Sequence, residues 1–90
     1  MRKNTGTWWA VVKYLAATDT RGTRWSVRVG RGRWVVPYDH ALSGLDRVVE
    51  ASRECVSEAA GDGWALTVVD SAYIDSLGVY VVVWRGGRDG

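Results

Sequence analysis

Phenylalanine is absent from this chain of 90 residues, and cysteine, histidine, proline and methionine each occur once. A single cysteine, Cys55, excludes an internal disulfide and is typical of a reducing compartment. One Cys and one His (His40) cannot assemble a metal site without carboxylates at ligand spacing, so we expect no metal and no cofactor. No apolar run approaches the ~20 residues of a membrane span, and the N-terminal residues lack the apolar core of a signal peptide. The sequence therefore predicts a soluble, cytoplasmic protein with no membrane partner.

Catalytic groups are also scarce. Nucleophilic catalysis would need a cysteine or a serine activated by His40, but Cys55 falls on the apolar face of the expected helix. Paired-carboxylate catalysis has no candidate, because the acidic residues of the expected helix lie on its outer face. We therefore expect a protein that is not an enzyme.

Tryptophan and tyrosine supply the large side chains instead, with six Trp and four Tyr. Each Trp can bury on the order of 150–250 Å² and carries an N–H that needs an acceptor. Six exceed what the core of one small domain usually needs. We therefore expect one domain over residues 1–90, frayed at 1–6 and 86–90, with some tryptophans at a surface that binds a partner.

The charges are unevenly distributed along the chain, although the formal net charge is only +2. Residues 1–35 hold eight basic residues and one acidic residue, whereas residues 36–84 hold two basic and eight acidic residues. This separation suits an anionic partner or head-to-tail self-association. Ten of the twelve basic residues are arginine, the side chain fitted to bidentate phosphate recognition. A GC-rich genome would produce the same excess of arginine over lysine without any role in phosphate recognition.

The hydrophobic pattern predicts an α+β fold, an antiparallel five-stranded sheet (β-β-β-α-β-β) with one helix packed on one face. Apolar and polar residues alternate at 24–29, and the helix pattern, with Ser43 as N-cap and Gly61 at its end, spans about 17 residues. β-Branched and aromatic residues mark the other strands. The strands are expected at 7–15, 24–29, 33–36, 64–69 and 78–85, with a loop at 70–77.

Alternation within the strands predicts an open, basic sheet face. If Trp25 faces the helix, then Arg24, Arg28 and Arg33 face away from it, and Lys13 and Trp9 share that outer face. Cations for phosphate and an aromatic plane for a base are the groups that hold nucleotides. The same face would also serve as a solvated surface, or as one covered by a second subunit.

Two further segments carry polar groups suited to an anion. Thr18, Thr20, Arg21 and Arg24 surround Gly22, whose lack of a side chain lets the backbone approach a phosphate. A plain polar hairpin loop is the alternative interpretation. Tyr38 and His40 precede the helix, whose N-terminal N–H groups attract anions. The candidate ligand-binding residues are Thr18, Thr20, Arg21, Arg24, Arg28, Arg33, Tyr38 and His40.

Short sequence motifs carry a resemblance. The string Lys13-Tyr14-Leu15, then Thr18, Arg21-Gly22-Thr23-Arg24, Val36-Pro37-Tyr38-Asp39-His40 and Leu42-Ser43-Gly44, resembles a group of short uncharacterised bacteriophage, prophage and plasmid proteins. Their closing strand is similar to Gly78-Val79-Tyr80-Val81. The resemblance covers most of residues 13–44 and, loosely, 78–83. It implies a mobile element acting in a bacterial cell, where small proteins often bind and disable a host defence component.

We therefore expect a non-enzymatic, homo-oligomeric protein of such an element that sequesters an anionic small molecule, most simply a nucleotide such as a host-defence signal. One alternative is an inhibitor of a host enzyme that makes its contact through Glu50, Glu54 and Glu58 on the helix. A third is weak, direct nucleic-acid binding by the basic half, which would fall steeply with salt.

Overall fold

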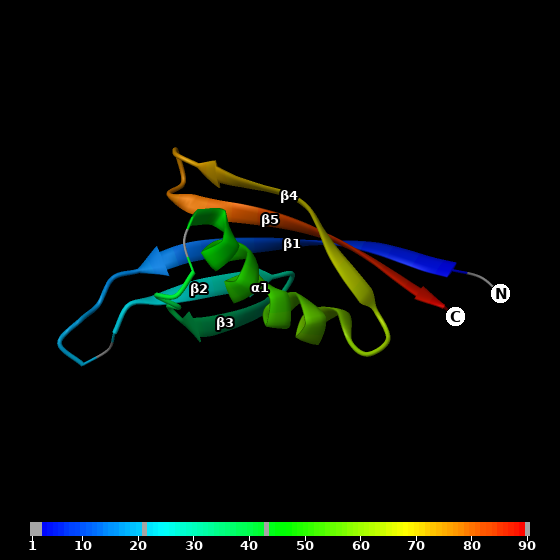
Figure 1. Ribbon diagram of the computed structural model, residues 1–90, viewed down its shortest axis with the longest axis horizontal. Coiled ribbons are helices and arrows are strands. Elements are labelled where there is room, and N and C mark those ends of the chain that lie inside the picture. Colours follow the sequence, from blue (N-terminus) through cyan, green and yellow to red (C-terminus); the bar gives the residue numbers. More distant parts are fainter. Residues whose placement is uncertain (1–2, 21, 43, 90) are drawn as a thin grey trace.

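The computed structural model describes residues 3–20, 22–42 and 44–89. A five-stranded antiparallel sheet with the strand order β3-β2-β1-β5-β4 carries one helix across one face (Figure 1). This confirms the predicted α+β class and its element order. The elements are β1 Lys3–Leu15, β2 Arg24–Val29, β3 Gly32–Pro37, α1 Gly44–Ala60, β4 Ala65–Ile74 and β5 Val79–Asp89.

The β2–β3 hairpin follows the predicted alternation. Strand β2 has its predicted bounds, and Trp25, Val27 and Val29 are buried beneath the helix. Gly30 takes a φ of 57° at the turn, a conformation that glycine adopts at little cost. Strand β3 pairs only with β2 and is therefore an edge of the sheet.

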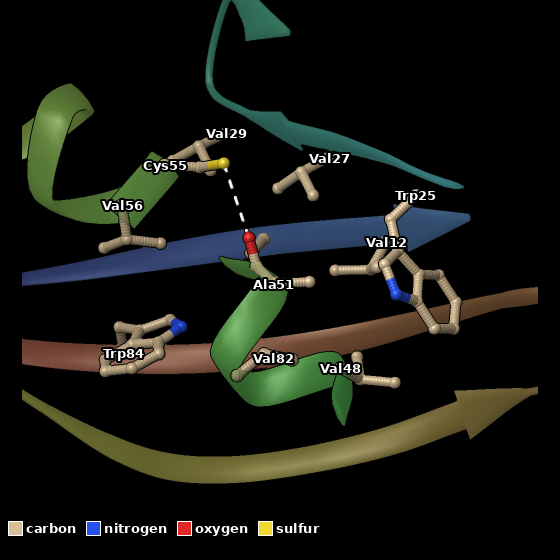
Figure 2. Packing of buried hydrophobic residues seen from close by; sticks show 11 residues of the cluster. Val12, Trp25, Val27, Val29, Val48, Ala51, Cys55, Val56, Val82 and Trp84 are labelled. Carbon is tan, nitrogen blue, oxygen red and sulfur yellow. Dashed lines mark hydrogen bonds between the residues drawn. The ribbon is translucent and has the colours of Figure 1, made fainter. Parts of the chain in front are cut away.

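Helix α1 packs its apolar side on the sheet. Asp46 lies in its first turn, where a negative charge interacts favourably with the positive end of the helix dipole. Ser43, the expected N-cap, lies outside the described residues. At the other end Gly61 has a φ of 88° and donates its N–H to the Ser57 carbonyl at 3.0 Å, as expected for a helix stop. Figure 2 shows the buried side chains between helix and sheet, which include Val12, Trp25, Val27, Val48, Ala51, Cys55, Val56, Val82 and Trp84.

The two ends of the chain pair with each other, which corrects the expectation of frayed tails. Residues 3–6 of β1 lie opposite residues 86–89 of β5, with Gly6 facing Gly86, while residues 1, 2 and 90 lie outside the described part. The rings of Trp8 and Trp64 meet edge to face at 4.9 Å. A Cβ on Gly86 would come within 2.9 Å of the Trp8 ring. A side chain at this position would therefore force the neighbouring rings or Leu66 to shift.

Strand β4 is longer than predicted. It continues to Ile74, so the loop expected at 70–77 is wrong except for its last residues. A register shift between Val68 and Asp70 leaves Val69 as an extra, outward residue with 52 % exposure. Such a bulge reverses which residues face the helix. Because the alternation changes phase at Val69, the sequence pattern looks like the end of a strand.

Within the described residues, no helix has the length and apolarity that crossing a bilayer requires.

Candidate functional site

The face of the sheet opposite the helix is uncovered by any described element (Figure 1). Its most exposed aromatic side chain is Trp9, with 61 % of its surface accessible. The other five tryptophans are buried or partly buried. Trp9 is therefore the tryptophan whose ring is most open to a partner on this face.

Three cations lie on the same face as Trp9, and we call Lys13, Arg28 and Arg33 the cationic cluster. Arg28 and Arg33 are direct cross-strand partners, and Arg28 also faces Val11 of β1. Trp9 and Lys13, two residues to either side of Val11, are therefore the diagonal neighbours of Arg28. Direct partners have Cβ atoms about 4.5–5.5 Å apart and diagonal ones about 7–8 Å.

No acidic side chain of the described chain forms an ion pair with the cationic cluster. All three side chains are exposed, and like charges placed directly opposite destabilise a sheet. The one ion pair among the residues described joins Arg53 to Glu50, on the helix. The open face therefore carries a concentrated, unpaired positive charge next to an indole plane.

Arg24 lies at the start of β2, where it is a diagonal neighbour of Lys13, whose direct partner is Ser26. Arg24 lies four positions before Arg28, a distance of about 13 Å along the strand. Its Nη1 donates to the Gly22 carbonyl at 3.2 Å, and its Nε is buried without an acceptor in the described chain. Arg24 also borders a hollow of about 340 Å³ together with Val35 and Pro37. The hydrogen bond to Gly22 directs the Arg24 side chain toward the loop rather than toward Arg28.

The loop between β1 and β2 holds the remaining polar candidates. Thr18 and Thr20 are exposed there, on the approach to Arg24. Arg21 lies outside the described residues, so the expected phosphate-wrapping loop is seen only in part.

Tyr38 and His40 lie on the other side of the sheet, with the helix. Tyr38 stacks on Trp25, with 5.4 Å between ring centroids, and His40 lies 4.8 Å from Tyr38. Because Trp25 and Arg24 are consecutive strand residues, they point to opposite faces. The eight expected ligand residues therefore do not form one site.

Arg47 organises the segment that carries Tyr38 and His40. Its guanidinium lies over the Tyr38 ring at 4.2 Å and donates to the Tyr38 hydroxyl. It also donates to the carbonyls of Asp39, at 3.0 Å, and of Leu42. Sequence reasoning missed this residue, because nothing in the linear order shows that residues 38–42 fold back over the first helical turns.

A pocket of about 510 Å³ opens beside Tyr38 and His40; we call it the helix-side pocket. Its rim includes the carboxylates of Asp39, Glu50 and Glu54. The sequence predicted a site that binds an anion here, beside the helix N-terminus. These three side chains are negatively charged and would repel an anion. An anion at Tyr38 and His40 would meet three carboxylates. Arg47 would not offset them, because its guanidinium already donates to groups of residues 38–42.

The open face has an apolar half next to the cationic cluster. Trp9, Val11, Ala72, Ile74, Val81 and Val83 line a hollow of about 330 Å³, with Asp70 at its border. Trp9 stands where the two halves meet. The sequence did not show this hollow, because residues 70–74 were expected in a loop rather than in β4.

Cys55 lies in the core, as the helix pattern predicted. It is 3 % exposed, and burial raises the pKa of its thiol above its usual value, with further raising by the carboxylates of Glu58 and Glu54. A thiol in this state is a poor nucleophile. Among the residues that the structure describes, no group of His, Cys, Asp and Glu is arranged to hold a metal ion.

No protein-family model, curated protein or solved structure matches this chain.

Proposed function

We propose that this chain is a non-enzymatic binding protein that captures an anionic small molecule, most simply a nucleotide, on the open face of its sheet. One observation carries the proposal. Arg28 and Arg33 form a direct cross-strand pair without a carboxylate partner in the described chain. The exposed Trp9 is the diagonal neighbour of Arg28.

The phosphate of the ligand would lie on Arg28 and Arg33. Guanidinium groups match the geometry of phosphate oxygens and form charge-assisted, bidentate hydrogen bonds. An anion there would also remove the repulsion between the two arginines, and Lys13 adds a third positive charge. Binding would thus relieve a cost that the empty sheet carries.

The base of the ligand would lie on Trp9. Stacking of a base on an aromatic side chain is worth about 1–3 kcal/mol and does not depend on which base it is. The apolar hollow that begins at Trp9 offers further surface to a ring. The diagonal arrangement of Trp9 and Arg28 suits a phosphate and a base that belong to one nucleotide.

The resemblance to mobile-element proteins supplies the setting of the proposal, the cytoplasm of a bacterial host. A protein that works there by sequestration would remove a nucleotide such as a defence signal. On a flat face a small ligand stays partly in solvent, so a second subunit over the open face would hold it more tightly. Homo-oligomerisation is for this reason part of the proposal.

Single-stranded nucleic acid is the second candidate ligand, because an antiparallel sheet face with cations and aromatic rings also binds single strands. Such platforms stack successive bases, whereas the open face offers a single exposed ring, Trp9, among the described residues. The third candidate, an inhibitor that mimics phosphates with its helix, is weaker. Glu50 is paired with Arg53, and Glu58 accepts the Trp34 indole N–H at 3.0 Å.

Native mass spectrometry of protein purified from bacterial cells, followed by calorimetric titration with ATP, tests the proposal. We expect ATP to bind, and the double variant Arg28→Ala/Arg33→Ala to weaken binding by about tenfold or more, because hydrogen bonds to charged groups contribute about 1.5–3 kcal/mol. Trp9→Ala should weaken binding by about fivefold or more. Arg31→Ala, which removes the same charge at the exposed hairpin turn, should leave the affinity unchanged.

Equal ATP affinity in the folded double variant and the wild type would overturn the placement of the site. No captured mass and no ATP binding, together with tight, salt-dependent binding of a ten-nucleotide oligothymidylate, would instead establish the single-strand alternative.

A further inference from the structure

The helix-side pocket is separate from the open face and has the opposite charge. Its volume of about 510 Å³ falls within the range of small-molecule sites, about 300–1,000 Å³. One wall is made by the rings of Trp25, Tyr38 and His40, and the other by the α1 residues Glu50 and Glu54. The pocket therefore combines an aromatic wall with an acidic one.

The aromatic wall already binds a cation of its own chain. Trp25 and Tyr38 are stacked with 21° between their planes, and the Arg47 guanidinium lies 4.2 Å from the centre of the Tyr38 ring. Ring faces attract cations through their quadrupole. The contact with Arg47 shows that this wall accommodates a positively charged planar group.

The acidic wall is only partly neutralised. Arg47 gives its described hydrogen bonds to the Tyr38 hydroxyl and to two backbone carbonyls, and to no carboxylate. Glu50 is paired with Arg53 at 2.9 Å, and the Asp39 carboxylate accepts the Ala41 N–H. Glu54 makes no ion pair with any described residue. With Glu50 paired to Arg53, the carboxylates of Asp39 and Glu54 face the single guanidinium of Arg47, so the pocket is negative and Glu54 is its free charge.

We propose that the helix-side pocket binds an organic cation, namely an ammonium or guanidinium group on an apolar or aromatic stem. The charged group would pair with Glu54, and the stem would lie against Pro37, Tyr38 and His40. This inference is independent of the nucleotide proposal, because it uses the opposite face of the sheet and none of the cationic cluster.

The pocket continues into a groove that favours a ligand with a stem. A second hollow of about 330 Å³ shares Val36, Pro37, Glu50 and Glu54 with it and extends along edge strand β3 to Trp34 and Glu58. A compact inorganic cation would leave this apolar floor empty. Either a free amine or the basic side chain of a protein partner has the required shape.

Trp25 provides the reporter for a test. Its indole N–H is buried, has no acceptor among the described residues, and belongs to a ring that lines the pocket. In ¹⁵N–¹H spectra this resonance, assigned with a Trp25→Phe variant, would be followed during three titrations. The probes are tyramine, N-acetyl-arginine-N′-methylamide, and 3-(4-hydroxyphenyl)propionate, the last an anion with the same ring as tyramine.

We expect saturable shifts with at least one of the two cations, at a Kd of about 1 mM or tighter. The anion should bind at least about tenfold more weakly. Tighter binding of tyramine would identify a free amine as the ligand type, and tighter binding of the capped arginine a protein side chain. Glu54→Gln should weaken binding of the tighter-binding cation by about two- to fivefold, the effect expected for a partly exposed ion pair.

Asp70→Asn is the matched control, because it removes one negative charge from the open face and should leave cation binding unchanged. No saturable shift with either cation would overturn the proposal. Equal binding of the anion, or a folded Glu54→Gln variant with unchanged affinity, would also overturn it.

Discussion

The indole N–H of Trp84 donates a hydrogen bond to Oγ of Ser52 at 3.0 Å, and both side chains are fully buried. Ser52 in turn donates to the Val49 carbonyl at 2.9 Å. Trp84 lies on β5 and Ser52 on α1, so this bond joins the helix to the sheet in the core. It explains how a tryptophan can occupy the interior without an unsatisfied donor.

Replacing Ser52 by alanine should therefore destabilise the fold by about 1–3 kcal/mol, the cost of leaving a buried donor without an acceptor. Urea unfolding followed by circular dichroism would measure the difference. Ser57→Ala, an exposed serine on the same helix, is the matched control and should change stability by less than about 0.5 kcal/mol.

A double-mutant cycle with Trp84→Phe separates the hydrogen bond from packing. Ser52→Ala should cost less in the Trp84→Phe background, which has no indole N–H. Equal costs in the two backgrounds would show that the bond contributes nothing.

Gly86→Ala should destabilise the paired ends of β1 and β5. An added Cβ would lie 2.9 Å from Leu66 Cδ2 and from a Trp8 ring atom, and 3.1 Å from Trp64. Overpacking of this kind typically costs about 1–3 kcal/mol. Thermal unfolding would measure the loss, with Gly22→Ala as the control because a Cβ added there would meet no atom within 4 Å. Equal effects of the two substitutions would show that the rings move aside freely.

Cys55 should make stability fall at alkaline pH. Its folded-state pKa is raised above that of the unfolded chain, first by burial and then by Glu58 and Glu54. Above the unfolded pKa, the unfolded chain has released the thiol proton while the folded chain retains it, so the folded state loses stability as pH rises. This contribution is fully present below the unfolded pKa and is lost as the pH rises through the folded pKa.

Urea unfolding at several pH values between about 8 and 10 would measure the effect. The slope of the unfolding free energy against pH should be flatter in Cys55→Ala than in the wild type, whatever the offset caused by the lost packing. Identical slopes would mean that the thiol titrates alike in both states. Iodoacetamide should also modify Cys55 far more slowly in the native protein than in urea.

Much of the fold could be predicted from local patterns. The alternation of residues 24–29 and the three- and four-residue spacing of apolar positions along the helix each repeat with the period of one element. The same reasoning mispredicted the end of β4. One extra residue, Val69, reverses the alternation there, and the following Asp70 and Ser71 are residue types common in loops. The ends of β1 and β5 were missed because glycine-rich segments have low strand preference, which the Trp8 and Trp64 rings override.

The candidate site could be predicted only in part. The alternation of side chains along a strand was enough to place Arg24, Arg28 and Arg33 on the face away from Trp25. It could not show that Arg28 and Arg33 are direct partners, or that Tyr38 and His40 lie across the sheet beside carboxylates from the helix. Those relationships depend on cross-strand register and on how the helix packs on the sheet.

By itself, the sequence determined the types and order of the elements, the helix-facing side of β2 and the burial of Cys55, because each follows from spacing between neighbouring residues. The tertiary structure decided the strand order, the length of β4, the pairing of the chain ends and the separation of a basic face from an acidic pocket. These features come from contacts between residues far apart in the chain, whose energies depend on packing and register that no local period encodes.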